Sequence, residues 1–187
     1  MAAIALKPGA AAVEIGPGQG ALTQQLLEAA GALEVVEIDR DLAALLRSRY
    51  AGQPRFVLHE GDALQVDWRE MAAARGARLR LIGNLPYNIS TPLLFRALDA
   101  ADAILDMHFM LQREVVDRIV AAPGTPAYGR LTVMLAPRVS AARLIDVGTG
   151  AFRPAPKVAS SVVRLVVRDQ LPPWAASPLK PACPPWP

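Results

Sequence analysis

Short apolar runs alternate with amphipathic stretches along most of this chain, and this alternation restricts the fold more than any other feature. Apolar runs of about four to eight residues indicate buried strands, and longer stretches with apolar residues three and four apart indicate helices. Strands separated by helices predict a mainly parallel sheet with helices on both faces. The predicted strands are Ala11–Ile15, Leu33–Ile38, Arg55–Leu58, Leu79–Ile82, Leu105–Leu111, Ala142–Val147 and Ser161–Val167.

The stretches between these strands predict six helices. Thr91 is a residue type that caps helices and Pro92 suits a first helical position, so one helix is expected to begin at Pro92. A Pro- and Gly-rich loop, not a helix, separates the last two strands, which could therefore pair as an antiparallel hairpin at one edge. The predicted helices are Ala21–Ala30, Arg40–Tyr50, Trp68–Arg75, Pro92–Leu98, Arg113–Ala121 and Arg130–Ala136.

Composition excludes several classes of protein. The 187 residues, 52% of them hydrophobic, suffice for one buried core. No apolar run reaches the roughly 18 residues of a membrane span, and Met1–Leu6 does not resemble a signal peptide, so the cytoplasm is the expected compartment. Cys183 is the single cysteine, and His59 and His108 are the two histidines, so we expect no disulfide framework and no metal site.

Positive charge is concentrated in the second half of the sequence. Residues 1–105 contain 10 basic and 12 acidic side chains, whereas residues 106–168 contain nine basic and four acidic ones. Most of the basic side chains are arginine, which suits bidentate contacts with phosphate. This distribution is typical of nucleic-acid binding, although a coding bias toward Ala and Arg would produce it as well.

A glycine-rich turn joins the first predicted strand to the first predicted helix. Gly16, Gly18 and Gly20 allow a tight turn and let a ligand approach the main chain at a helix N-terminus. Their spacing is G-x-G-x-G rather than the G-x-G-x-x-G of dinucleotide sites, which favours S-adenosylmethionine over NAD. A purely structural turn is the alternative for this motif alone.

Carboxylates lie at the end of the second predicted strand and just after the third. Glu37 lies about 20 residues beyond the glycines, where an acidic group can accept hydrogen bonds from both ribose hydroxyls. Asp39 is expected to cap the next helix, and a contribution to the ligand site stays open. Asp62 should lie at the same edge of the sheet, positioned to accept a hydrogen bond from the adenine amino group of the cofactor, or it is simply a turn residue.

The sequence Asn84-Leu85-Pro86-Tyr87 follows the fourth predicted strand. An exocyclic adenine nitrogen is a poor nucleophile because its lone pair is delocalised into the ring. The Asn84 amide oxygen and the main-chain carbonyl beside Pro86 can accept hydrogen bonds from that amino group and orient its lone pair. Tyr87 could stack on the base once the base has left its helix. We therefore expect transfer to an adenine amino group in RNA.

Residues 6–165 resemble the KsgA family of small-subunit ribosomal RNA adenine N6,N6-dimethyltransferases. The resemblance implies a class I methyltransferase fold, S-adenosylmethionine as cofactor, no metal, and a monomer that acts on the immature small ribosomal subunit. The matching segments are Glu14–Thr23, Val36–Leu42, Glu60–Leu64, Ile82–Leu94, Asp106–Arg118, Tyr128–Met134 and Gly150–Leu165.

The resemblance also assigns roles to single residues. It implies that Phe152, in the sequence Phe-Arg-Pro-Ala-Pro-Lys-Val, closes on the target adenine from the face opposite the tyrosine, although such a residue could also be a packed loop anchor. Arg153 and Lys157 beside it could hold phosphates. The family's cofactor contacts fall on Gly16, Glu37, Asp62 and Asn84, and its target-base residues on Asn84, Leu85, Pro86 and Tyr87.

Two family segments have no counterpart in this sequence, and we expect a form shortened at both ends. The predicted methyltransferase domain, residues 1–168, lacks the family's N-terminal lid over the cofactor. Residues 169–187 are expected to be a Pro-rich irregular tail in place of the family's helical C-terminal domain. Two other functions stay open: an erythromycin-resistance-type methyltransferase acting on large-subunit ribosomal RNA, and a ribosome-assembly protein that binds with little or no catalysis.

Overall fold

Seven strands form one sheet in the order β3-β2-β1-β4-β5-β7-β6. The computed structural model describes residues 4–151, 156, 158–170 and 172. Strands β1 to β5 are parallel, and β7 lies antiparallel between β5 and β6. The seven strands and the antiparallel hairpin at one edge are therefore confirmed. The strands are β1 (Ala12–Ile15), β2 (Leu33–Glu37), β3 (Phe56–Glu60), β4 (Leu79–Asn84), β5 (Ile104–Gln112), β6 (Val139–Val147) and β7 (Ser160–Val167).

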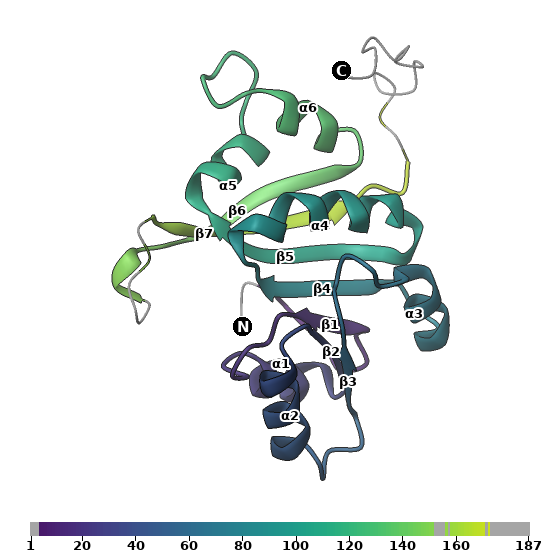
Figure 1. Ribbon diagram of the computed structural model, residues 1–187. Coiled ribbons are helices and arrows are strands. Elements are labelled where there is room, and N and C mark those ends of the chain that lie inside the picture. The colour runs from purple at the N-terminus through teal and green to yellow at the C-terminus, as the bar shows by residue number, and fades with distance from the viewer. Residues whose placement is uncertain (1–3, 152–155, 157, 171, 173–187) are drawn as a thin grey trace, which may run out of the picture.

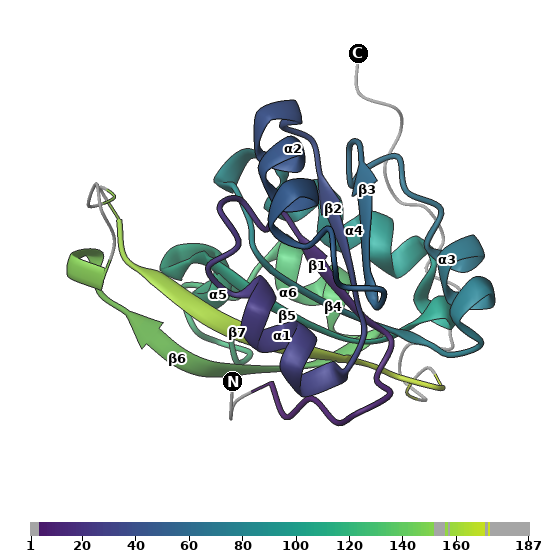
Figure 2. The ribbon, with the colours of Figure 1, turned by 90° about the horizontal axis from the view of Figure 1, so that it is seen from below.

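Helices cover both faces of the sheet (Figures 1 and 2). Alternate residues of β1 point to opposite faces, so Val13 and Ile15 belong to one apolar cluster and Ala12 to another. The larger cluster packs α3, α4 and α5 on one face, and the smaller one packs α1 and α2 on the other. The helices are α1 (Thr23–Ala30), α2 (Arg40–Arg49), α3 (Trp68–Arg75), α4 (Tyr87–Asp99), α5 (Arg113–Ile119) and α6 (Arg130–Leu135), with short 3-10 turns η1 (Ala101–Ala103) and η2 (Thr149–Ala151).

The prediction that a helix begins at Pro92 is wrong, because α4 begins at Tyr87 and contains Pro92. A proline inside a helix lacks the N–H that would donate to the carbonyl four residues earlier, here that of Asn88. The Ser90 hydroxyl donates to the Tyr87 carbonyl at 3.0 Å, so a side chain supplies a hydrogen bond within this first part of the helix. Tyr87 is thus the first residue of α4, and only Leu85 and Pro86 separate it from the end of β4.

Charged side chains are buried where β4 and β5 pair. Arg80 donates two hydrogen bonds to Asp106, at 2.9 and 2.8 Å, and also donates to the carbonyls of Ile4 and Ala5. His108 lies beside this pair, and burial lowers its pKa from 6.5 to about 4, so its imidazole is neutral near pH 7. Because Arg80 is held by Asp106 and donates to the carbonyls of Ile4 and Ala5, it fixes the start of the described chain against the sheet.

Candidate active site

The parallel arrangement brings the ends of five strands to one edge of the sheet. In the strand register, Ile15 is opposite Gly83, Glu37 is opposite Glu60, and Asn84 is opposite Met110. The last residues of β1 to β4 and the segments that follow these strands contain the glycines, the carboxylates and the Asn-Leu-Pro-Tyr sequence. Apart from Phe152, which lies outside the described residues together with Arg153 and Lys157, the predicted site residues therefore lie along one edge.

The glycine-rich turn after β1 has a backbone that favours glycine. Gly16, Gly18 and Gly20 have φ angles of 63°, 58° and 82°, in the left-handed region that other residues rarely adopt. The Gly16 N–H donates to the Val36 carbonyl at 2.9 Å, which fixes the turn against β2. The result is a rigid connection between β1 and α1 beside the end of β2.

Glu37 links the end of β2 to this turn. Its side chain is buried, with 5% of the residue exposed, and Oε2 accepts a hydrogen bond from the Gly18 N–H at 3.0 Å. Oε1 accepts from the Asp39 N–H, also at 3.0 Å. A carboxylate offers about four acceptor positions, so two hydrogen bonds leave capacity for the hydroxyls of a ligand.

The other two carboxylates have local structural partners. Asp39 caps α2 as expected, because its Oδ1 accepts from the N–H groups of Asp41 and Leu42 at 2.9 and 3.1 Å. The Oδ1 of Asp62 accepts from the Leu64 N–H at 2.9 Å, which is the turn arrangement considered as the alternative. These contacts occupy one oxygen of each carboxylate, so they do not exclude a ligand at the second oxygen of Asp62.

The sequence analysis missed Glu14, a buried carboxyl group in the centre of this edge. Glu14 is 3% exposed, and its Oε2 accepts a hydrogen bond from the Thr23 hydroxyl at 2.6 Å. Burial raises its pKa from 4.5 to about 7; the Thr23 hydrogen bond lowers the pKa and the nearby charge of Glu37 raises it. An acidic residue inside an otherwise apolar strand was the sequence feature that could have indicated this position.

The Asn-Leu-Pro-Tyr segment presents a mixture of buried and exposed groups. Asn84 ends β4 and is exposed, Pro86 is exposed, and Tyr87 is 45% exposed at the start of α4. Leu85 is different: it is 2% exposed, its side chain belongs to the core, and its N–H donates to the Met110 carbonyl at 3.2 Å. Leu85 can therefore contact a ligand only through its main chain.

The edge combines two chemical surfaces. The glycine turn and Glu37 offer main-chain N–H groups and a carboxylate, which suit the hydroxyls of a nucleoside. Asn84 and Tyr87 offer an amide and an exposed aromatic ring, which suit the edge and face of a base. In the part of the chain that the structure describes, no group of three or more His, Cys, Asp or Glu could hold a metal ion.

The model of the family described as "Ribosomal RNA adenine dimethylase" matches residues 1–178. The chain belongs to this family. The predicted resemblance to the KsgA family is thereby confirmed. The match extends beyond residue 168, and the domain boundary proposed from the sequence stays a prediction.

Individual members of the family are similar in sequence and in structure. The chain is 57% identical over 163 residues to ribosomal RNA small subunit methyltransferase A of Chromohalobacter salexigens, covering 86% of this chain and 58% of that relative. It resembles the crystal structure of a dimethyladenosine transferase from Plasmodium falciparum with a TM-score of 0.79 and 28% identity, over 89% of this chain and 59% of the other. The class I methyltransferase fold is thus confirmed.

A second solved structure is nearly as similar. The 23S rRNA methyltransferase ErmE superposes with a TM-score of 0.78 and 28% identity, covering 90% of this chain and 65% of that one. The chain therefore spans about three fifths of the length of the adenine dimethylase relatives that it matches. Among the helices that the structure describes, none has the length and apolarity to cross a bilayer.

Proposed function

We propose that this chain transfers methyl groups from S-adenosylmethionine to the N6 atoms of adjacent adenines in small-subunit ribosomal RNA, forming N6,N6-dimethyladenosine. The observation that supports this most is that Asn84 and Tyr87 lie along the same sheet edge as Glu37 and the glycine turn, in a chain of the ribosomal RNA adenine dimethylase family. The proposed partner is the immature small ribosomal subunit, and the proposed compartment is the cytoplasm.

In this proposal the first three strand ends hold the cofactor. The Glu37 carboxylate accepts hydrogen bonds from the ribose hydroxyls, and the second oxygen of Asp62 accepts one from the adenine amino group. Gly16 and Gly18 keep the main chain close to the ligand, since no side chain stands between them and it, and Gly20 completes the turn where it packs against Leu46 and Arg49 of α2. Bound S-adenosylmethionine supplies an electrophilic methyl group on a sulfonium.

The residues after β4 hold the target base. The Asn84 amide oxygen and the Leu85 carbonyl, beside Pro86, accept hydrogen bonds from the adenine amino group, which directs the nitrogen lone pair away from the ring plane. Tyr87 is exposed and can stack on one face of the base. Phe152 is the proposed partner on the other face. The methylated ammonium is acidic enough to lose its proton to water, so no strong base is needed.

The decisive experiment measures transfer from labelled S-adenosylmethionine to small ribosomal subunits that lack the modification. The released nucleosides are then analysed by mass spectrometry. We expect N6,N6-dimethyladenosine from the 187-residue chain. Cofactor binding without any methylated product would contradict the enzymatic proposal and favour a ribosome-assembly protein that binds without catalysis.

Methylation of large-subunit RNA is the second candidate, because the ErmE structure is nearly as similar as the dimethyladenosine transferase structure. The 57% identity to a small-subunit methyltransferase favours the first substrate. Offering unmodified small and large subunits in separate reactions distinguishes them. Product only from the large subunit would replace the first proposal with the second.

A further inference from the structure

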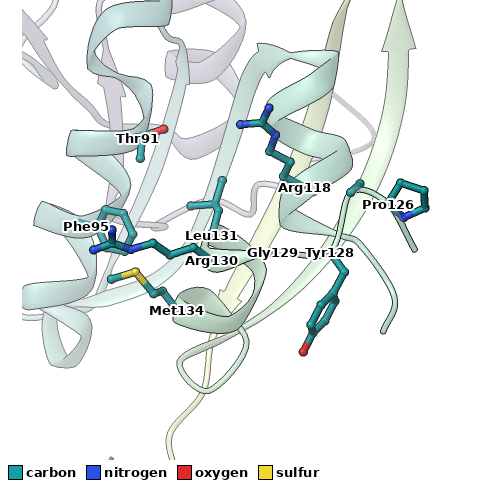
Figure 3. Close-up of a pocket in the computed structure, with 10 residues that line it drawn as sticks. Thr91, Phe95, Arg118, Pro126, Tyr128, Gly129, Arg130, Leu131 and Met134 are labelled. Carbon is teal, nitrogen blue, oxygen red and sulfur yellow. The ribbon is translucent and has the colours of Figure 1, made fainter. Parts of the chain in front are cut away.

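A groove of about 740 Å³ lies outside the catalytic edge, between α4, α5, α6 and the loop that precedes α6 (Figure 3). Its volume falls within the range of roughly 300–1,000 Å³ that is common for ligand sites. We call it the α4–α6 groove. Its lining residues are Thr91, Phe95, Arg118, Pro126, Ala127, Tyr128, Gly129, Arg130, Leu131 and Met134.

Buried hydrogen bonds fix the far wall of the α4–α6 groove. The hydroxyl of Thr132, which is 5% exposed, donates to the Arg118 carbonyl at 2.5 Å. The same oxygen accepts from the Gly129 N–H at 3.3 Å. Thr132 thus joins α6 to α5 and fixes the position of the residues on either side of Gly129. The groove therefore exists without a ligand.

The groove is cationic and partly aromatic. Among the described residues that line it are two arginines and no carboxylate. Arg130 is exposed and extends from the start of α6 toward the side on which Phe95 lies, while Arg118 is on α5 (Figure 3). Tyr128 is 41% exposed. Two guanidinium groups and an exposed ring that line one groove suit phosphates and a stacked base better than an apolar protein segment.

Nearby acidic residues do not cancel this charge inside the groove. Glu114 pairs with Arg118 across one helical turn, on an exposed surface where the Arg118 side chain is 56% accessible. Asp117 pairs with Arg143 of β6. Exposed ion pairs of this kind are weak, so Arg118 can exchange its carboxylate partner for a phosphate at little cost.

Helix α4 connects the groove to the proposed target-base site, because Tyr87 begins this helix and Thr91 lines the groove. Thr91 follows Tyr87 by four residues in α4, so the two lie on the same helix face about one turn apart. A base at Tyr87 would therefore have its neighbouring nucleotides near the Thr91 side of the groove. The helices that form the groove belong to the same face of the sheet (Figure 1).

We propose that the α4–α6 groove binds the single-stranded RNA that flanks the target adenine, with Arg118 and Arg130 on phosphates and Tyr128 stacked on a base. This inference rests on the proposed function, because it places the RNA relative to the catalytic edge. It assigns substrate binding to residues that lie outside the Asn-Leu-Pro-Tyr segment.

The experiment measures binding of a short fluorescent single-stranded RNA, with two adjacent adenines at its centre, to the 187-residue chain over a range of salt concentrations. The slope of log K against log salt is negative. We expect Arg118→Ala and Arg130→Ala each to reduce its magnitude by about 0.7, the value for one phosphate contact on a single strand. Tyr128→Ala should weaken binding about tenfold or more, and Tyr128→Phe should restore it, because stacking needs only the ring.

Two controls separate this inference from the proposed function. Arg47→Ala removes an arginine of α2, 61% exposed and on the opposite face, and should leave RNA binding unchanged. Titration with S-adenosylmethionine should give the same affinity for every groove variant. Where methyl transfer occurs, the groove variants should raise the RNA KM and leave kcat unchanged.

The outcomes are distinguishable. Groove variants that bind RNA as the unsubstituted chain does overturn the inference, whether or not methyl transfer occurs; a protein segment would then be the better occupant. Loss of RNA binding in the groove variants, with no transfer by the unsubstituted chain, supports the groove and contradicts the proposed function. An unsubstituted chain that binds no RNA overturns the groove inference as well.

Discussion

Thr23 of α1 donates a hydrogen bond to the buried carboxyl group of Glu14 in β1, at 2.6 Å. The contact crosses the glycine-rich turn, so it fixes the start of α1 relative to the end of β1. Glu14 lies between an apolar interior and the acidic edge that contains Glu37, and both surroundings disfavour its ionised form. The carboxyl group that supports the candidate cofactor site is thus half protonated near pH 7.

The raised pKa of Glu14 predicts a pH-dependent stability. The group titrates near 4.5 when unfolded and near 7 when folded. Its contribution to the free energy of unfolding is therefore complete below pH 4.5 and is lost as pH rises through 7. The pKa shift corresponds to a loss of unfolding free energy on the order of 3 kcal/mol between pH 4.5 and about 7. Urea unfolding at several pH values, for the unsubstituted chain and for Glu14→Gln, measures this difference directly.

Glu14→Gln isolates the effect of the titrating group, since glutamine cannot ionise but keeps the size of the side chain and an oxygen that accepts from Thr23. The other titrating groups are common to both chains and cancel in the difference. Parallel curves of unfolding free energy against pH would show that burial does not raise the Glu14 pKa.

The strands were predictable and the helix ends were less so, for a physical reason. Buried parallel strands are short apolar runs, and all seven appear in the sequence within a few residues of their observed bounds. The start of α4 was not predictable from local rules, because Thr91 and Pro92 match the pattern of a helix start, whereas the helix begins at Tyr87 and continues through both residues. The local pattern alone therefore does not set the helix boundary.

The candidate site divides in the same way. Gly16, Glu37 and Asn84 were predictable because each lies at or just after the carboxyl end of a strand, and the ends of parallel strands meet at one edge. Glu14 was missed because it lies inside a strand. The α4–α6 groove was beyond sequence analysis, since its walls come from α4 and α6, which are far apart in the chain and lie close together only after folding.

Gly83 is expected to be required where β1 and β4 approach each other. A Cβ atom at Gly83 would lie 2.6 Å from the Ile15 carbonyl oxygen, which is a main-chain atom that cannot rotate away. Gly83→Ala should therefore lower the free energy of unfolding by about 1–3 kcal/mol, measured by urea denaturation. Gly61→Ala is the matched control, because a Cβ there meets nothing within 4 Å and should leave stability unchanged or slightly raised. Equal losses in both variants would refute the steric argument.

Glu37 and Asp39 lie two residues apart and should differ in their effect on cofactor binding. Glu37→Gln should weaken S-adenosylmethionine binding roughly 10- to 150-fold, because it replaces charge-assisted hydrogen bonds to the ribose by neutral ones. Asp39→Asn should bind normally, since asparagine caps a helix as well as aspartate does and Asp39 already serves α2. Titration calorimetry with the cofactor compares the two. A similar loss in Asp39→Asn would show that Asp39 contributes to the ligand site after all.

Asn84 should be needed for turnover and not for folding. It is exposed at the end of β4, so Asn84→Ala removes little packing, and the free energy of unfolding should stay near that of the unsubstituted chain. Without the amide oxygen, the adenine amino group loses one of two acceptors, and kcat should fall about 10²- to 10³-fold in the methyl-transfer assay. Asn88→Ala, which replaces the exposed asparagine at the second position of α4, should retain activity. If Asn84→Ala and Asn88→Ala had equal turnover, Asn84 would have no specific part in the proposed mechanism.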